Sequence, residues 1–321
     1  MIYKEKVSVV VITYNSSATI LETLNSVFHQ THHAENIELI ITDDASSDNT
    51  VEIISFWLID HKEYFSNVKF FANTVNKGVS KNCNVAWRTA SCDWIKTIAG
   101  DDILLPNCIT DNVKESKHID QNVGVIFSMM DVFYVSKNRE KKIINKYPMS
   151  YHIKILGSSL EEQFNYLKYG DIAAAPSAFI RNSALQNVNY ADERFDSLED
   201  LPLWYNMVKA GWRLSFLDEV TVQYRVGEST TSSSKRLVNE AFIKDIIKID
   251  DLLIRNDLEN KKIFLNIRKY IWPRLVLFIA KSSGNKINFL TRNSLRVAYI
   301  IKPYGLKSFL SSRVKKIINK Y

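Results

Sequence analysis

Three pairs of adjacent carboxylates in this sequence lie at the ends of predicted elements. Asp43-Asp44 and Asp101-Asp102 each follow a short apolar run, and Glu199-Asp200 precedes a predicted helix. In an open α/β sheet, ligands bind outside the carboxyl ends of the strands, so carboxylates at such an end are placed to meet a ligand. Mg2+ is usually held by one or two carboxylates together with the phosphates of a substrate. Asp101-Asp102 is therefore a candidate site for a divalent metal and a polyphosphate.

Each pair also has a purely structural interpretation. Asp is favoured at helix caps and in turns, so Asp101-Asp102 could cap the helix that follows, and Asp43-Asp44 could order the turn at 45–50. Glu199-Asp200 could supply first-turn acids that the helix dipole favours. Taken one at a time, the pairs leave both interpretations open.

Alternating strands and helices must position these pairs. Runs of apolar, largely β-branched residues predict strands at 7–13, 37–42, 68–72 and 94–98. Apolar residues at helical spacing predict helices at 20–28, 51–64 and 79–90. This alternation predicts an α/β fold with a mostly parallel central sheet and right-handed crossovers. No Gly-x-Gly-x-x-Gly motif follows the first strand, which argues against a nicotinamide-binding domain.

The pattern is less regular after residue 122. It predicts an exposed turn at 139–142, strands at 123–127, 131–135 and 177–180, and helices at 159–169 and 201–210. The Ser- and Thr-rich segment 227–234 is predicted to be a loop or hinge. It is the expected boundary between a catalytic domain, residues 1–226, and a basic helical region, residues 227–321.

Cysteine usage and hydropathy bear on where the protein works. The three cysteines, Cys83, Cys92 and Cys108, have no Cys-x-x-Cys spacing, which indicates neither a disulfide framework nor a zinc ribbon. A reducing cytosol is the simplest compartment for such a chain. The start of the chain lacks the features of a signal peptide, and no uncharged apolar run is long enough to cross a bilayer. We therefore expect a cytoplasmic protein, soluble or peripheral to a membrane.

Charge is distributed unevenly along the chain. The net charge is +7, but residues 236–321 carry 19 Lys and Arg against 6 Asp and Glu, and no acidic residue follows Glu259. Such a segment favours an anionic partner, which could be a membrane surface, a phosphorylated substrate or a nucleic acid. Basic amphipathic helices with aromatic residues lie well on anionic membranes, so residues 261–321 are predicted to dock at the inner leaflet. The alternative is a soluble helical cap packed on the catalytic domain or on a second subunit.

Taken in order, the motifs resemble the inverting family 2 glycosyltransferases, which have the GT-A fold. The resemblance runs from Val7 to Tyr224, about two-thirds of the chain. Besides the acidic pairs, the motifs that carry it are Thr13-Tyr14-Asn15, Ser26-Val27-Phe28-His29-Gln30-Thr31, Asn76-Lys77-Gly78-Val79-Ser80 with Asn84, and Phe195-Asp196. Each motif is weak alone, and the ordered set is strong. Within residues 1–226, the resemblance implies a nucleotide-sugar half at about 1–105 and an acceptor half at about 106–226.

The resemblance implies a role for each matching position. Asp102 would bind the metal, Mn2+ or Mg2+, and Asp200 would be the catalytic base. Asp44 would accept a hydrogen bond from the base of the nucleotide. Possible acceptor or diphosphate contacts are Glu199, Trp204 and Arg225, although packing is an alternative role for Trp204. The remaining residues implied to bind the nucleotide are Thr13, Tyr14, Asn15, Lys81 and Asp101.

The predicted activity is metal-dependent, inverting transfer of one sugar from a nucleotide sugar, most simply a UDP-sugar. The implied acceptor is a hydroxyl of a lipid-diphosphate-linked saccharide in surface-polysaccharide synthesis, such as O-antigen or capsule. Many relatives have Tyr-Arg-x-His after the base, whereas this chain has Gly227 in place of that His. The alternatives are a sugar-nucleotide nucleotidyltransferase and a basic nucleic-acid binder. A nucleotidyltransferase would need a Gly-rich phosphate loop after the first strand, and this chain has none. Only the basic tail favours a nucleic-acid binder, so no nucleic-acid partner is expected.

Overall fold

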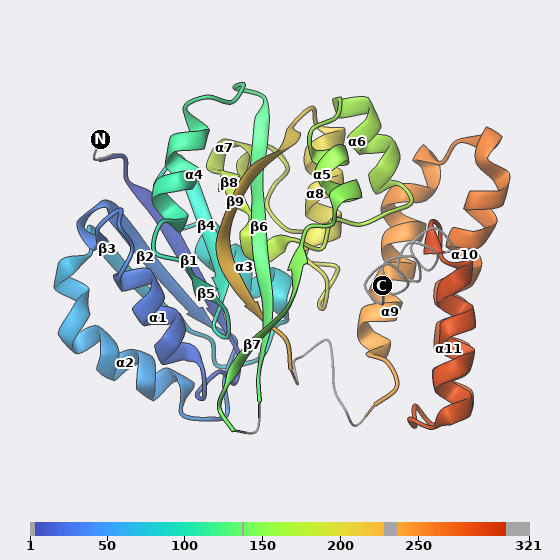
Figure 1. Ribbon diagram of the computed structural model, residues 1–321, viewed down its shortest axis with the longest axis horizontal. Helices are drawn as coiled ribbons and strands as arrows, with labels where there is room; N and C mark the ends of the chain where they lie inside the picture. The colour runs from blue at the N-terminus through green and yellow to red at the C-terminus, as the bar shows by residue number, and fades with distance from the viewer. Residues whose placement is uncertain (1–3, 137, 228–235, 306–321) are drawn as a thin grey trace, which may run out of the picture. The chain divides into compact units, whose positions relative to one another are not determined.

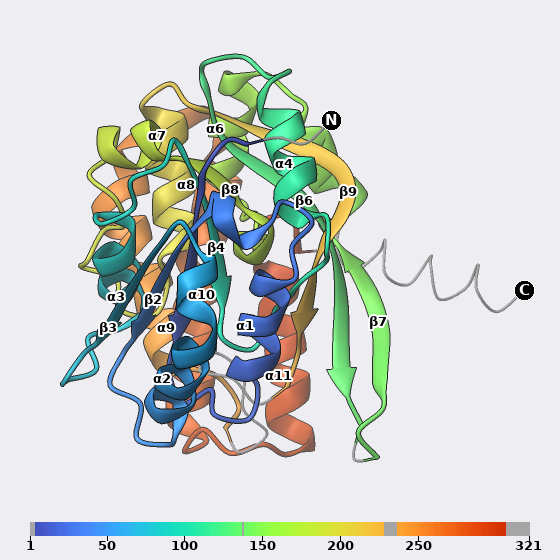
Figure 2. The ribbon, with the colours of Figure 1, turned by 90° about the vertical axis from the view of Figure 1, so that its left-hand side faces the viewer.

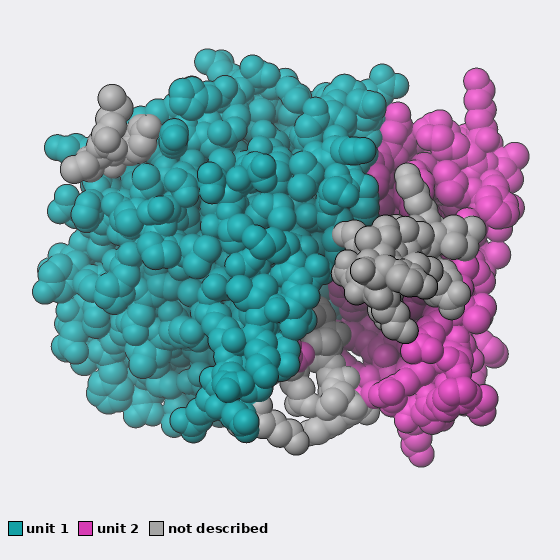
Figure 3. Space-filling view, viewed as in Figure 1, with its two compact units in different colours: residues 1–164, 172–226 teal, residues 165–171, 227–321 magenta. Residues whose placement is uncertain are grey.

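The structure is a computed structural model that describes residues 4–136, 138–227 and 236–305. The chain divides into two compact units, which Figure 3 colours separately. Residues 1–164 and 172–226 form unit 1, and residues 165–171 and 227–321 form unit 2.

Unit 1 is built on one nine-stranded sheet whose order is β3-β2-β1-β4-β8-β6-β9-β5, with β7 paired to β6 (Figure 1). The strands are β1 (Val7–Thr13), β2 (Ile37–Asp43), β3 (Asn67–Ala72), β4 (Trp94–Ala99), β5 (Ile103–Leu104), β6 (Val123–Val135), β7 (Lys141–Tyr147), β8 (Phe179–Arg181) and β9 (Arg213–Arg225). β1 to β4 are mutually parallel and β6 is parallel to β9, whereas β8, β5 and β7 run antiparallel to their neighbours. The sheet is therefore mostly parallel, as predicted.

The first four strands form a crossover region in which sequence and structure agree closely. α1 (Ile20–Phe28) and α2 (Thr50–His61) pack on one face of the sheet, and α3 (Val79–Trp87) lies on the other (Figures 1 and 2). Right-handed crossovers require this arrangement, because the chain moves outward from β1 to β3 and then returns past β1 to β4. β1 and β2 are almost entirely buried, which explains their continuous apolar runs.

The second half of the sheet departs from the predicted elements. Residues 123–135 form one continuous strand, β6, where two were predicted. Lys141 and Lys142, predicted to lie in an exposed turn, begin β7. β9 was not predicted at all. Its partner register skips from Leu217 to Val220, so exposed Asp218 and Glu219 interrupt both the pairing and the apolar pattern.

Five further α-helices complete the description of unit 1. They are α4 (Cys108–Ser116), α5 (Ser150–Leu156), α6 (Leu160–Leu167), α7 (Asn182–Asn187) and α8 (Asp200–Lys209). The last residues of α6 already belong to unit 2. α8 ends near Gly211, whose φ of 99° favours glycine. The helix predicted at 201–210 is thus present, beginning one residue earlier at Asp200.

Unit 2 is helical over its described residues. α9 (Glu240–Ile249) continues into a π-helical turn (Asp250–Ile254), and α10 (Ile263–Ser282) and α11 (Phe289–Ile301) follow. The three α-helices lie side by side around Ile243, Trp272, Val276 and Ala298 (Figure 1). Among the described residues, no helix is both long enough and apolar enough to span a membrane. The loop predicted at 227–234 lies outside the described residues except for Gly227.

Residues 165–171 group with unit 2, although the sequence placed them within the catalytic region. Lys168 Nζ lies 3.2 Å from Glu259 Oε1. The Tyr169 hydroxyl donates to Asn266 Oδ1 over 2.8 Å. Both contacts join residues that are far apart in the chain, so no local pattern could have indicated them.

Candidate active site

The first acidic pair divides into two separate roles. Asp43 ends β2 directly beside Thr13, the last residue of β1, and the Thr13 hydroxyl donates to Asp43 Oδ2 over 2.6 Å. Ser46 donates to the same carboxylate through its backbone N–H, over 2.8 Å, and through its hydroxyl, over 2.5 Å. Asp43 therefore orders the turn that follows it, as the structural interpretation proposed.

Asp44 holds a different segment. Its carboxylate oxygens accept the backbone N–H groups of Lys77 and Gly78, each over 2.9 Å. Asp44 is buried, so this carboxylate fixes the loop that leads into α3. A carboxylate has lone pairs beyond these two bonds, and its role toward a nucleotide base stays a prediction.

The start of α3 is tied to the segment that precedes Glu199-Asp200. Gly78 has a φ of 87°, and a Cβ there would lie 2.6 Å from the backbone O of Asp196. Ser80 donates its hydroxyl to the backbone O of Phe195 over 2.5 Å. Asn84 exchanges two hydrogen bonds with the backbone of Ala191, each of 2.9 Å. The motif at 76–84 thus acts as a clamp that positions residues 191–196.

Lys81 lies at this clamp. Its Nζ is 3.6 Å from Asp196 Oδ1, and both side chains are substantially exposed. Exposed pairs of this kind contribute little to stability. A role for Lys81 toward a diphosphate stays a prediction.

The turn after β1 closes against the turn after β4. Tyr14 is 39% exposed, and Asn15 has a left-handed φ of 51° and accepts the Ser47 N–H over 2.8 Å. A Cβ at Gly100 would lie 3.0 Å from the Thr13 methyl group, so glycine allows the two turns to approach closely. Three of the residues predicted to bind the nucleotide, Thr13 to Asn15, therefore lie beside the backbone that leads into Asp101.

Asp101-Asp102 is the most unusual electrostatic feature of unit 1. Asp102 is 0% exposed, and its Oδ1 accepts the backbone N–H of Arg225 over 2.8 Å. Its Oδ2 is buried and has no hydrogen-bond partner among the residues that the structure describes. Burial, and then the adjacent charge of Asp101, raise the pKa of Asp102 well above its ordinary value, and burial also raises the pKa of Asp101. A bound cation would relieve this cost.

Arg225 connects the acidic pair to two other elements. Its Nε donates to the backbone O of Asp101 over 2.7 Å, and its guanidinium forms an ion pair with Glu22 on α1. The guanidinium also lies 4.7 Å from the ring centre of Phe133, and Lys141 Nζ lies 4.4 Å from the same ring. Lys141 Nζ also lies 4.0 Å from Glu22 Oε1, so Arg225 and Lys141 share the Glu22 carboxylate.

Two groups, Tyr224 and Cys83, have pKa values that are raised by burial and by carboxylates from different acidic pairs. Burial, followed by the charges of Asp102, Asp101 and Asp200, raises the pKa of Tyr224 to about 12. On the clamp side, burial and then the charges of Glu199 and Asp44 raise the pKa of the Cys83 thiol. Asp102 and Asp200 thus both influence Tyr224, and Glu199 and Asp44 both influence Cys83.

Glu199 and Asp200 lie at the start of α8. Asp200 Oδ1 accepts the backbone N–H of Leu201 over 2.7 Å, as a first-turn acid does. Burial raises the pKa of Glu199. The helix-start interpretation thus accounts for one oxygen of Asp200, and a carboxylate near Tyr224 can also serve as a base.

Trp204 belongs to the core. It is 2% exposed and packs edge-to-face on Phe127, with ring centres 5.1 Å apart. A sugar cannot stack on a ring that is buried in this way. The packing alternative therefore accounts for Trp204, and we omit it from the proposed acceptor site.

The residues present fit a metal bound partly by substrate. No three or more His, Cys, Asp and Glu side chains are grouped to hold a metal ion anywhere in the described part of the chain. The orphaned, buried Oδ2 of Asp102 nevertheless offers one strong oxygen ligand beside a second carboxylate. Sparse protein ligation completed by phosphate oxygens is characteristic of Mg2+.

Comparison with known proteins identifies the class. The family model described as Glycosyl transferase family 2 matches residues 8–187, more than half of the chain. Escherichia coli WfaP, a UDP-Glc:alpha-D-GlcNAc-diphosphoundecaprenol beta-1,3-glucosyltransferase, is 28% identical over 234 residues, which cover 72% of this chain and 81% of WfaP. This chain therefore belongs to glycosyl transferase family 2, which favours the glycosyltransferase over both alternative functions.

Solved structures show the same fold. S. aureus TarS 1–349 in complex with UDP-GlcNAc superposes with a TM-score of 0.61 and 20% identity, covering 93% of this chain and 82% of that chain. The mannosyltransferase PcManGT from Pyrobaculum calidifontis, in complex with GDP-Man and Mn2+, has a TM-score of 0.52 and 14% identity, covering 97% and 76%. The predicted α/β GT-A fold with a C-terminal helical segment is confirmed.

Sequence reasoning missed three residues that surround the Arg225 side chain, Glu22, Lys141 and Phe133. Glu22 and Phe133 lie within regular elements whose patterns gave no chemical signal, and Lys141 was assigned to a turn. Only the adjacency of α1, the β6–β7 hairpin and the end of β9 brings them together. The sequence did indicate Arg225, because the family resemblance implies a diphosphate or acceptor contact at that position.

Proposed function

We propose that this enzyme transfers one sugar, with inversion, from a nucleotide sugar to a hydroxyl group, and that a divalent metal assists the reaction. The observation that carries the proposal is the buried, unpartnered Oδ2 of Asp102 beside Asp101. Family membership and the fold shared with a UDP-GlcNAc complex support a UDP-sugar as the donor.

Asp102 would hold the metal, Mn2+ or Mg2+. When bound, such a cation stabilises the negative charge that develops on the departing diphosphate. Arg225 acts as a positioning residue, since its backbone N–H holds Asp102 and its side chain holds the backbone of Asp101. The Arg225 cation, whose Nε donates to the backbone of Asp101, offers positive charge to phosphate oxygens, which compensates for Gly227 in place of the usual His.

Asp200 would be the catalytic base. An acceptor hydroxyl is a weak nucleophile until a positioned group takes its proton. One oxygen of Asp200 is held by the N–H of Leu201, which fixes the orientation of the carboxylate. A base on the face of the sugar opposite the diphosphate gives a single displacement, so an α-linked donor yields a β-linked product.

The acceptor we propose is a lipid-diphosphate-linked saccharide in surface-polysaccharide synthesis, such as O-antigen or capsule. WfaP acts on a diphosphoundecaprenol-linked sugar by its name, and it matches most of this chain. Such acceptors are presented at a membrane. We therefore propose that the enzyme works at the inner face of the cytoplasmic membrane, where its basic helical region meets anionic lipid.

An Asp102→Asn variant tests the metal site through the melting temperature of the protein, measured without metal and with Mn2+ and UDP-sugar. Removing an uncompensated buried charge leaves the melting temperature unchanged or raised without metal, and the shift produced by Mn2+ with UDP-sugar disappears. Transfer falls by about 10² or more. Asp218→Asn, an exposed carboxylate in the β9 irregularity, is the matched control and keeps both the shift and the activity. A full Mn2+-dependent shift in Asp102→Asn would refute the assigned role.

A further inference from the structure

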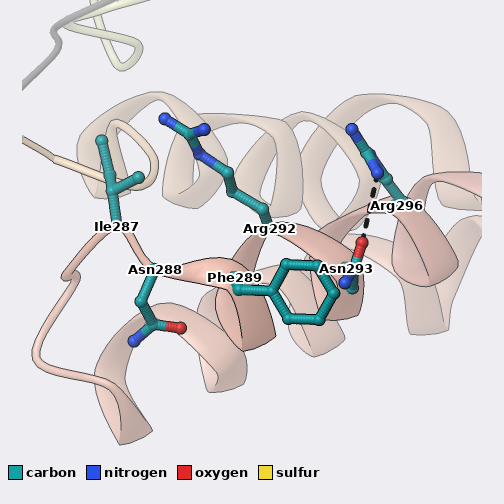
Figure 4. Close-up of a pocket in the computed structure, with 6 residues that line it drawn as sticks. All are labelled: Ile287, Asn288, Phe289, Arg292, Asn293 and Arg296. Carbon is teal, nitrogen blue, oxygen red and sulfur yellow. Dashed lines mark hydrogen bonds between the residues drawn. The ribbon is translucent and has the colours of Figure 1, made fainter.

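Two adjacent hollows lie along α11 in unit 2. The first has a volume of about 440 Å³ and is lined by Ile287, Asn288, Phe289, Arg292, Asn293 and Arg296 (Figure 4). The second, of about 470 Å³, shares Ile287, Arg292 and Arg296 with the first. Arg236, Leu237, Leu295 and Tyr299 complete it. Neither hollow is lined by a carboxylate.

The arginines of α11 differ from other arginines of unit 2. Arg255 and Arg274 form ion pairs with Asp251, and Arg268 donates to the backbone carbonyls at 300–302. Within the described residues, the Arg292 guanidinium makes no hydrogen bond or ion pair, and the Arg296 guanidinium donates only to Asn293 Oδ1, over 3.2 Å. The two guanidinium groups lie on the same side of the helix (Figure 4). They form a cationic site that no carboxylate of the described part of the chain neutralises.

Two exposed apolar residues begin α11, and one of them, Phe289, lines the first hollow together with Arg292 and Arg296. Phe289 is 79% exposed and Leu290 is 74% exposed, the two highest values among the large apolar residues that the structure describes. The spacing of Phe289, Arg292 and Arg296 places these three on one face of α11. The other face is covered, since Ala298 is buried and Leu295 and Ile301 pack on the core of unit 2. The free face of α11 is thus both cationic and apolar.

We propose that the hollows between Arg292 and Arg296 bind the phosphate headgroup of an anionic membrane phospholipid, while Phe289 and Leu290 insert at the bilayer interface. Arginine binds phosphate in a bidentate manner, and exposed aromatic and aliphatic residues beside it match the boundary between headgroups and acyl chains. The absence of acidic residues after Glu259 adds charge complementarity. This inference rests on the proposed membrane association and assigns that association to one face of one helix.

The test measures binding of the full chain to vesicles of phosphatidylglycerol and phosphatidylcholine, and to vesicles of phosphatidylcholine alone. We expect binding to the anionic vesicles only, and a loss of about tenfold or more in Arg292→Glu/Arg296→Glu. The control is Lys261→Glu/Lys281→Glu, which makes the same change in net charge at two exposed lysines, one just before α10 and one within it. This control is expected to lose much less vesicle binding. An equal loss in both double variants would overturn the site and leave only diffuse attraction.

Further measurements separate the remaining outcomes. Phe289→Ser/Leu290→Ser is expected to weaken binding to the anionic vesicles while the arginines stay in place. Inorganic phosphate or duplex DNA that displaced the chain completely at equal ionic strength would overturn the phospholipid assignment. Transfer to a water-soluble acceptor is expected to be unchanged in all these variants. If the wild-type protein transferred no sugar to the water-soluble acceptor, the proposed function would be wrong. If the wild-type protein transferred sugar but did not bind anionic vesicles, only the phospholipid site would be wrong.

Discussion

At the scale of single residues, the two aspartates of one pair have quite different environments. Asp43 accepts hydrogen bonds from Thr13 and Ser46, whereas Asp44 holds the N–H groups that lead into α3. Asp102 is different again, because one of its oxygens is buried without a partner. An oxygen of this kind is costly in a folded protein unless a ligand satisfies it. The environment, more than the residue type, thus separates the structural aspartates from the proposed metal ligand.

The proposed base can be tested by a nearly isosteric change. In Asp200→Asn the amide oxygen can still accept the Leu201 N–H, so the start of α8 is preserved. We expect kcat to fall by about 10²- to 10⁴-fold, because the acceptor hydroxyl loses its base. Binding of UDP, measured by calorimetry, is expected to be nearly unchanged. Glu161→Gln, an exposed first-turn acid of α6, serves as the control, and full transfer by Asp200→Asn would disprove the assignment.

At the scale of elements, buried polar contacts fix how the strands and helices meet. Glu38 on β2 joins three neighbours, accepting from Lys69 on β3 over 2.8 Å, from Ser8 on β1 over 2.5 Å and from the Ser91 N–H over 2.8 Å. The clamp formed by hydrogen bonds from Ser80 and Asn84 fixes α3 against residues 191–196 in the same way. The Glu38 junction lies near the amino-terminal ends of β1 and β2, whereas the acidic pairs follow the carboxyl ends of the strands, so the two sets of contacts fix opposite edges of the sheet.

The Glu38 junction predicts a specific pH dependence. Burial opposes ionisation, but hydrogen bonds from Lys69, Ser8 and Ser91 outweigh it and lower the pKa of Glu38 from 4.5 to about 2. The unfolded chain therefore binds the proton more tightly, so this stabilisation is complete above about pH 4.5 and is lost as the pH falls toward 2. Urea denaturation of Glu38→Gln is expected to show lower stability at pH 7 and a smaller loss between pH 5 and 3 than the wild type.

Glu52→Gln provides the comparison for this experiment. Glu52 is exposed in the first turn of α2, and its replacement is expected to leave both the stability and its pH dependence close to those of the wild type. If Glu38→Gln lost stability with acid as steeply as the wild type, the Glu38 carboxylate would not be the group responsible.

At the scale of the whole molecule, opposite charges are segregated along the chain. Residues 236–321 carry 19 Lys and Arg against 6 Asp and Glu, so this segment has a strong net positive charge, while the acidic pairs belong to unit 1. Anionic lipid surfaces attract basic segments by about 1 kcal/mol per Lys or Arg close to the surface, and this attraction decays over roughly 10 Å at 0.1 M salt. A membrane-bound acceptor would therefore be used most efficiently when the surface around it is anionic.

This charge segregation predicts how transfer depends on the membrane. With a lipid-linked acceptor, we expect severalfold faster transfer on vesicles containing phosphatidylglycerol than on neutral vesicles, and we expect the advantage to vanish at high salt because the attraction is screened. A radiolabelled-donor assay at low and high salt measures both effects. Equal rates on the two kinds of vesicle at low salt would contradict the membrane proposal without affecting the assignments of Asp102 and Asp200.

The sequence by itself determined the first half of the fold and the residues worth testing. Buried parallel strands are read from continuous apolar runs, and carboxylates after such strands must gather at one rim of the sheet. The tertiary structure alone decided the rest. β9 pairs through an irregularity that hides its pattern, Trp204 enters the core, and Glu22, Lys141 and Arg225 meet beside Asp101-Asp102. These outcomes depend on contacts between residues distant in the chain, and local propensity carries no information about such contacts.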